Sequence, residues 1–228
     1  MRKILIFLAL LVLTMAIVFL IPQVRTPRGL VQNVSDKNHV YILLGGMRSW
    51  DGVITSAGMY GLKSELLTSF PNTNVKTYTW SSYSDAANEI NGLPKDDVVI
   101  VIGYSGGGSR ATWLANMAFH PKIDLMVLYD PSPKWQMKSI PVNVKHSVCY
   151  HNLRGALLGL GGGVCRGVGI ETVDINENHL AVQLNESLHQ RTIEEVRRVS
   201  RPPLRGGVPE AGAPTSNRLW PIARTLNP

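Results

Sequence analysis

The chain has 228 residues, of which 44% are hydrophobic and 17% charged, and a formal net charge of +7. This length suits one domain of ordinary size, and the composition excludes a disordered chain or a coiled coil. Many basic residues lie near the two chain ends, and aromatic residues do not alternate with them as in nucleic-acid-binding surfaces. We therefore expect no nucleic acid among its partners.

An uncharged apolar run at 4–21 follows Arg2 and Lys3. As a helix it would extend about 27 Å, close to the hydrocarbon thickness of a bilayer. The run is longer than the apolar part of a typical signal peptide, and no small-x-small cleavage site follows it. These features favour an uncleaved membrane anchor at 1–22. The remaining chain would then lie outside the cytoplasm, or be secreted if the segment were cleaved.

After a predicted linker at 23–37, short apolar runs alternate with helical patterns. Strands are predicted at 39–45, 74–80, 97–103, 123–129, 146–151 and 169–175. Helices are predicted at 55–69, 83–91, 107–119 and 180–198. This alternation predicts an α/β domain at 38–200, with a mostly parallel sheet of about six strands and helices on both faces, a three-layer sandwich. Residues 201–228 are rich in Pro, Gly and Arg, which predicts a disordered tail.

The stretch GYSGG at 103–107 fits the pattern G-x-S-x-G where a predicted strand meets a predicted helix. That context is typical of a nucleophile elbow, in which glycines let a serine occupy a strained turn. The hydroxyl of Ser105 would then be exposed, and the amide of Gly106 would point to the same space. The patterns of a phosphate-binding loop and a dinucleotide site do not fit this stretch.

A nucleophilic serine needs a base and an orienting carboxylate, and with such an elbow their chain order is serine, acid, histidine. His179 follows the last predicted strand and precedes a helix, which favours it over His151 as the base. The sequence has no Asp or Glu between Pro131 and Ile170. The acid is therefore predicted to be Asp130, at the exit of the strand after the elbow, although an aspartate before proline is also common in turns.

Two further features concern the surroundings of this site. The loop after the first core strand contains Gly45 and Gly46, and the amide of Met47 is predicted to be the second oxyanion donor beside Gly106. The glycine-rich segment 152–169 could be a flexible lip facing the substrate or a packed connection.

The two cysteines, Cys149 and Cys165, allow either a disulfide or two free thiols. Two cysteines without suitably spaced histidines cannot form a structural zinc site, so no metal is expected.

These residues resemble the α/β-hydrolase superfamily, through the segments LLGGM, GYSGG, LYDPSP and NENHLAV. The Asp-Pro after the strand that follows the elbow is similar to the acid position of pancreatic-type lipases. The small size without a cap is closer to cutinase-type esterases. The resemblance implies hydrolysis of esters or thioesters through an acyl-serine intermediate, with Ser105, Asp130 and His179 as triad and no cofactor. A small-molecule or lipid ester is then the expected substrate.

A second hypothesis, from another class, is a catalytically silent, membrane-tethered binding protein with the same fold. A fluorophosphonate probe separates the two, because only an activated serine would be labelled.

Overall fold

The computed structural model describes residues 37–46, 56–119, 122–133, 136–152 and 161–200. The predicted anchor at 1–22, nearly all of the predicted linker, Met47 and the predicted tail at 201–228 lie outside the described residues. Among the helices of the described part, none is long and apolar enough to span a bilayer.

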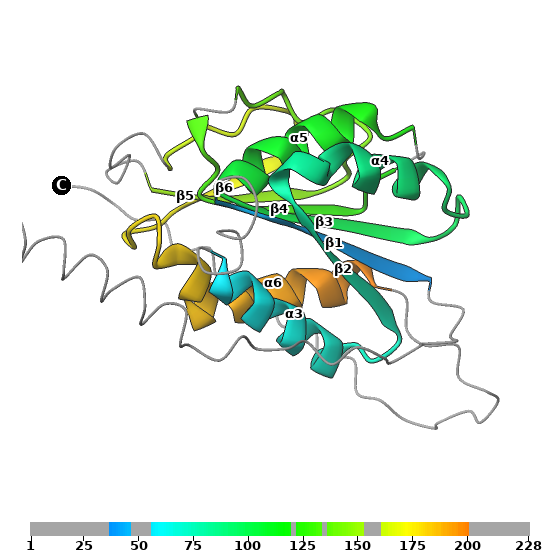
Figure 1. Ribbon diagram of the computed structural model, residues 1–228, viewed down its shortest axis with the longest axis horizontal. Coiled ribbons are helices and arrows are strands. Elements are labelled where there is room, and N and C mark those ends of the chain that lie inside the picture. Colours follow the sequence, from blue (N-terminus) through cyan, green and yellow to red (C-terminus); the bar gives the residue numbers. More distant parts are fainter. Residues whose placement is uncertain (1–36, 47–55, 120–121, 134–135, 153–160, 201–228) are drawn as a thin grey trace, which may run out of the picture. The chain divides into compact units, whose positions relative to one another are not determined.

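The centre of the domain is a parallel sheet, with six strands in the described residues and the spatial order β2-β1-β3-β4-β5-β6 (Figure 1). The strands are β1 (Asn38–Leu44), β2 (Thr73–Thr79), β3 (Val98–Tyr104), β4 (Leu125–Tyr129), β5 (Ser147–His151) and β6 (Ile170–Asp174). Every residue of β1, β3, β4 and β5 is buried, whereas β6 at the edge is largely exposed. The uninterrupted apolar runs of the inner strands are explained by burial on both faces.

Helices cover both faces of this sheet. Figure 1 shows α4 (Tyr83–Asn91) and α5 (Gly106–Met117) on one face, and α3 (Ala57–Ser69) and α6 (Glu186–Val199) on the other. Two separate apolar clusters correspond to these two interfaces, one containing Leu62 and Val196 and the other Ile90 and Leu114. The predicted α/β fold class with a covered parallel sheet is therefore confirmed.

The last predicted helix needs a correction. Instead of one helix at 180–198, the chain forms a short 3-10 turn, η4 (Val182–Leu184), and then α6. The interruption lies at Asn185, whose side-chain oxygen accepts a hydrogen bond from the Leu188 N–H at 3.1 Å. An asparagine cap of this kind satisfies a free amide at a helix start, so α6 begins anew at Glu186.

The two cysteines form a disulfide. Cys149 lies fully buried in β5, Cys165 is half-buried in the connection to β6, and their Cα atoms are 6.5 Å apart. The bridge closes a loop with a sequence separation of 16 residues. This resolves the choice between a disulfide and two thiols in favour of the disulfide.

Candidate active site

Ser105 occupies a strained turn between β3 and α5. Its φ of 54° and ψ of −121° lie in a region that side-chain-bearing residues rarely adopt. The glycines on both sides are required by close approach. A Cβ at Gly103 would lie 2.7 Å from the Gly107 carbonyl oxygen, and a Cβ at Gly107 would collide with the carbonyl of Leu43 in β1. The sequence GYSGG therefore lets α5 pack directly on the sheet while Ser105 lies at the carboxyl end of β3.

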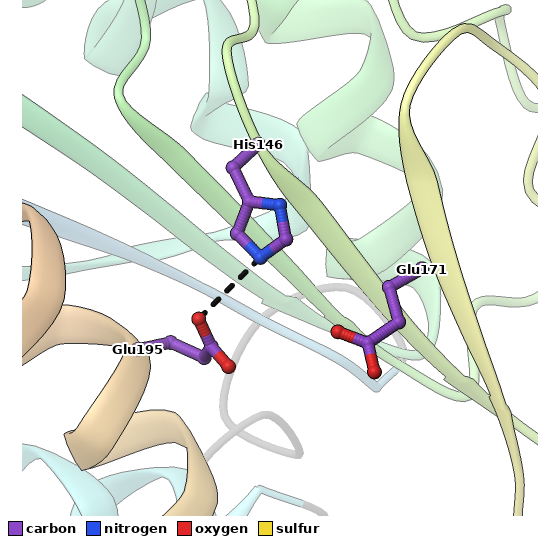
Figure 2. A group of neighbouring side chains, drawn as sticks. All are labelled: His146, Glu171 and Glu195. Atoms are coloured by element: carbon purple, nitrogen blue, oxygen red, sulfur yellow. Dashed lines mark ion pairs between the residues drawn. The ribbon is translucent and has the colours of Figure 1, made fainter. Parts of the chain in front are cut away.

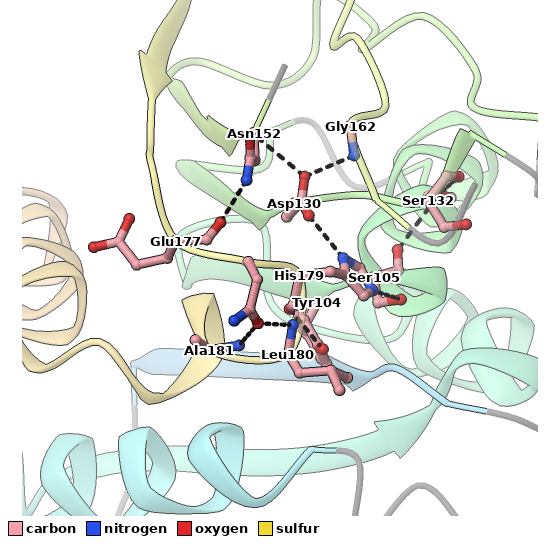
Figure 3. Close-up of polar contacts among 12 residues, drawn as sticks. Tyr104, Ser105, Asp130, Ser132, Asn152, Gly162, Glu177, His179, Leu180 and Ala181 are labelled. Atoms are coloured by element: carbon pink, nitrogen blue, oxygen red, sulfur yellow. Dashed lines mark hydrogen bonds and ion pairs between the residues drawn. The ribbon is translucent and has the colours of Figure 1, made fainter. Parts of the chain in front are cut away.

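The structure brings Ser105, His179 and Asp130 into one hydrogen-bonded chain (Figure 3). The Nε2 atom of His179 lies 2.8 Å from the Ser105 hydroxyl oxygen, and its Nδ1 atom lies 2.7 Å from Asp130 Oδ2. Since a carboxylate only accepts, Nδ1 carries the proton and Nε2 is free to accept one from the serine. The arrangement can transfer a proton from serine to histidine.

Asp130 is enclosed completely, with no exposed surface, at the end of β4. Its backbone φ is 40°, so this residue, like Ser105, is held in an uncommon conformation. Its second carboxylate oxygen, Oδ1, accepts hydrogen bonds from the backbone N–H groups of Gly162, at 2.7 Å, and Asn152, at 3.2 Å. Two donors on Oδ1 and the histidine on Oδ2 fix the plane of the carboxylate.

Tyr104 contacts His179 through both its hydroxyl and its ring. Its hydroxyl donates to the His179 carbonyl oxygen at 3.0 Å, and the two rings stack with centroids 5.3 Å apart and planes 26° apart. Burial raises the pKa of Tyr104, and the nearby Asp130 carboxylate raises it further. The phenol therefore stays protonated and able to donate at any pH at which the protein would work.

The space beside Ser105 suits an oxyanion. Gly106 is the first residue of α5, where backbone N–H groups have no partner within the helix. Gly45, after β1, lies so close to Ser105 that a Cβ there would be 2.8 Å from the serine Cβ. The loop after β1 thus begins beside Ser105, as the sequence predicts. Met47 lies outside the described residues, so its role as a donor stays a prediction.

The structure gives the other candidate residues different partners. The Nε2 atom of His151 lies 2.8 Å from the carboxylate of Asp174 in the neighbouring strand β6. Glu177 accepts a hydrogen bond on its backbone oxygen from the Asn152 side chain, and another on its carboxylate from Asn185. None of these side chains joins the hydrogen-bonded chain from Ser105 to Asp130.

The site is built from segments far apart in the sequence that meet at one edge of the sheet. Ser105 follows β3, Asp130 follows β4, and His179 follows β6, so all three lie beyond the carboxyl ends of parallel strands in the order β2-β1-β3-β4-β5-β6. This arrangement of strands and helices is α/β-hydrolase-like. The carboxyl edge of such a sheet is where open α/β folds bind ligands.

Comparison with solved structures finds similar chains. One is a protein from Xanthomonas campestris pv. campestris assigned to hydrolases of the α/β superfamily, with 11% identity, a TM-score of 0.44, and coverage of 71% of this chain and 96% of that one. Two are structures of acetyl xylan esterase, each with 13% identity and coverage of 72% of this chain and 98% of that one, at TM-scores of 0.42 and 0.40. No family model matches the sequence, and no curated protein matches it.

A second group of titratable side chains lies away from this site. His146, Glu171 and Glu195 have ligand atoms within 4.8 Å of one another, with His146 Nε2 at 3.4 Å from Glu195 (Figure 2). Each glutamate already pairs with an arginine: Glu171 with Arg191, and Glu195 with Arg198 at 2.8 Å. The group is therefore an ion-pair network that joins α6 to the amino-terminal parts of β5 and β6.

The residues that orient Asp130 and His179 were not predicted from the sequence. Tyr104 is visible only as the variable position of the G-x-S-x-G pattern, and Asn152 and Gly162 act through backbone N–H groups. A backbone donor leaves no signature in a single sequence. Only the glycine run at 161–163 is a visible signal, and it was open to two interpretations.

Proposed function

We propose that this protein is a serine hydrolase that cleaves carboxylic esters or thioesters through an acyl-serine intermediate. The observation that carries the proposal is the unbroken chain from the Ser105 hydroxyl through His179 to the buried Asp130. The strained backbone of Ser105 supports it, because such strain persists where the surrounding structure imposes it and is concentrated at active sites.

In this mechanism the Ser105 oxygen attacks the ester carbonyl carbon while His179 Nε2 takes the hydroxyl proton. The negative charge that develops on the carbonyl oxygen is stabilised by the N–H of Gly106 and by the positive end of α5. His179 then protonates the leaving alcohol or thiol as the tetrahedral intermediate collapses. Water, deprotonated by the same nitrogen, hydrolyses the acyl-serine and restores the enzyme. Asp130 keeps the proton on Nδ1 and stabilises the imidazolium.

The test is a pair of measurements on the wild-type protein and Ser105→Ala. A fluorophosphonate probe is expected to label only the wild type, and p-nitrophenyl esters of increasing acyl length are expected to be hydrolysed only by the wild type. Comparing acyl lengths gives the chain-length preference. A folded wild-type protein that neither reacts with the probe nor hydrolyses any of the esters would instead be the silent binding protein.

For location, the proposal is a membrane-anchored hydrolase with its domain outside the cytoplasm. The apolar run at 4–21 supports the anchor, and the Cys149–Cys165 disulfide supports an oxidising compartment. The protein is then expected to sediment with membranes and to resist extraction by salt, since an apolar helix is not released by screening. Purification of a form that begins after residue 21 would show cleavage instead.

A further inference from the structure

A short segment after β5 lies directly on the acid of the triad. We define this segment, residues 161–165, as the strap. Its Gly162 N–H donates to Asp130 Oδ1 at 2.7 Å (Figure 3), and its Gly163 N–H donates to the Pro131 carbonyl oxygen at 2.8 Å. The strap therefore holds both the side chain of Asp130 and the backbone of the next residue.

Gly161, the first residue of the strap, approaches both Asp130 and His179 closely. A Cβ at this position would collide with Asp130 Oδ2 and His179 Nδ1, the two atoms of the hydrogen bond that orients the base, and would lie 2.7 Å from Asp130 Cγ. Gly161 is itself buried. Its backbone thus covers the Asp130–His179 hydrogen bond and leaves no space there for water or for a side chain.

The strap is tied to the sheet at its far end. Cys165 is joined to Cys149 in β5, and β5 pairs with β4, the strand that Asp130 directly follows. Just beyond the disulfide, the Arg166 carbonyl oxygen accepts a hydrogen bond from the Ile140 N–H at 2.7 Å. The disulfide thus connects the cover of the acid to the strand beside the acid.

We infer that the strap is a positioning element for Asp130, and that the Cys149–Cys165 disulfide keeps it in place, so that turnover depends on the oxidised pair. This inference rests on the proposed serine hydrolase. It assigns Gly161 and Gly162 as positioning residues, because they act on the substrate only through Asp130 and His179.

The redox step is ordinary thiol–disulfide exchange. A dithiol reductant attacks a sulfur of the bridge, and the half-buried Cys165 is the more accessible side. A second exchange releases the reductant as a cyclic disulfide and leaves thiols at Cys149 and Cys165. Two electrons and two protons pass to the protein, and no other group changes. The freed strap then no longer holds Gly162 against Asp130.

The first test compares Gly161→Ala with Gly169→Ala, the same change in the same connection. A Cβ at Gly169 meets nothing within 4 Å, although its φ of +70° makes alanine strained there. Gly161→Ala is expected to lower kcat by about 10²-fold with little change in KM, since a small displacement of a catalytic group has an effect of that size. Gly169→Ala is expected to keep wild-type kcat. A folded Gly161→Ala protein with kcat within twofold of wild type would overturn the inference.

The second test removes the Cys149–Cys165 disulfide and leaves Gly161 unchanged. Cys149→Ala/Cys165→Ala, and wild type treated with dithiothreitol under native conditions, are both expected to lose at least about tenfold in kcat, as expected when one hydrogen bond to a charged group is weakened. Circular dichroism checks that the fold persists. This test also decides the matter if Gly161→Ala does not fold. Unchanged kcat in both the double variant and the reduced wild type would refute the role of the disulfide.

A third readout needs no turnover at all. The proton on His179 Nδ1 gives a downfield NMR resonance when it is held by Asp130, and we expect Gly161→Ala to shift or broaden it while Gly169→Ala leaves it unchanged. If the wild type hydrolyses no ester, the proposed function fails, and this resonance alone tests the strap. If the wild type is active and the resonance is the same in both variants, the inference fails and the proposed function stands.

Discussion

Asp130→Asn is the most informative single change, because the surroundings of Asp130 determine how the new amide must lie. The backbone N–H groups of Gly162 and Asn152 both donate to Oδ1, so the amide oxygen of asparagine has to take that place. The NH2 group then faces His179 Nδ1, which can only accept from it. The histidine proton moves to Nε2, and the base can no longer take a proton from Ser105.

The expected loss follows from this change of tautomer. The same substitution in serine protease triads lowers kcat by about 10⁴-fold, equivalent to about 5 kcal/mol in the barrier. We expect a loss of that order here, with the fold intact, because size and hydrogen-bonding positions are preserved. Hydrolysis of p-nitrophenyl acetate over a range of enzyme concentrations measures it.

Asp174→Asn is the matched control, since its carboxylate is largely exposed and pairs with His151. It is expected to change kcat less than threefold. An Asp130→Asn enzyme with kcat within tenfold of wild type would refute the reasoning about the tautomer. A large loss in Asp174→Asn alone would move the acid to β6.

Three other predictions concern the base, its support and a distant carboxylate. His179→Ala is expected to abolish ester hydrolysis while His151→Ala keeps most of it, and equal losses would reject His179 as the base. Tyr104→Phe removes the hydroxyl that donates to the His179 carbonyl oxygen. The free energy of unfolding, measured by thermal denaturation, should fall by about 1 kcal/mol, and kcat should fall modestly. Burial raises the pKa of Glu89, but hydrogen bonds from Lys76 and two tyrosines outweigh it and hold the pKa below its ordinary value. Wild type is therefore expected to be more stable than Glu89→Gln at neutral pH, by about 1 kcal/mol, and this difference should disappear as the pH falls through that lowered pKa. A difference in unfolding temperature that persisted at pH 2 would contradict this assignment.

Residues with a local signature could be placed from the sequence. The inner strands are continuous apolar runs, and each predicted strand lies within two residues of an observed one. Asp130 is predicted by elimination, because no carboxylate lies between Pro131 and Ile170. His179 was reached from its position after the last strand.

The features that could not be predicted from the sequence depend on contacts between distant segments. The pairing of His151 with Asp174 needs the register of β5 and β6, and the closeness of Gly161 to Asp130 needs the path of the connection. The break between η4 and α6, inside the helix predicted at 180–198, was missed because the apolar pattern continues through 180–184, whereas the cap at Asn185 acts through one side chain.

The edge position of β6 has a consequence for how activity would be lost. His179 is brought to Ser105, 74 positions earlier, by the one described strand that pairs on a single side and is mostly exposed. Edge segments open at lower free energy than the buried centre of a sheet. Local unfolding of β6 would separate His179 from Ser105 while β1, β3 and β4 remain paired. Ester hydrolysis would therefore be lost at lower denaturant concentrations than those that unfold the central sheet. Activity would return when the denaturant is diluted, without refolding of the whole domain.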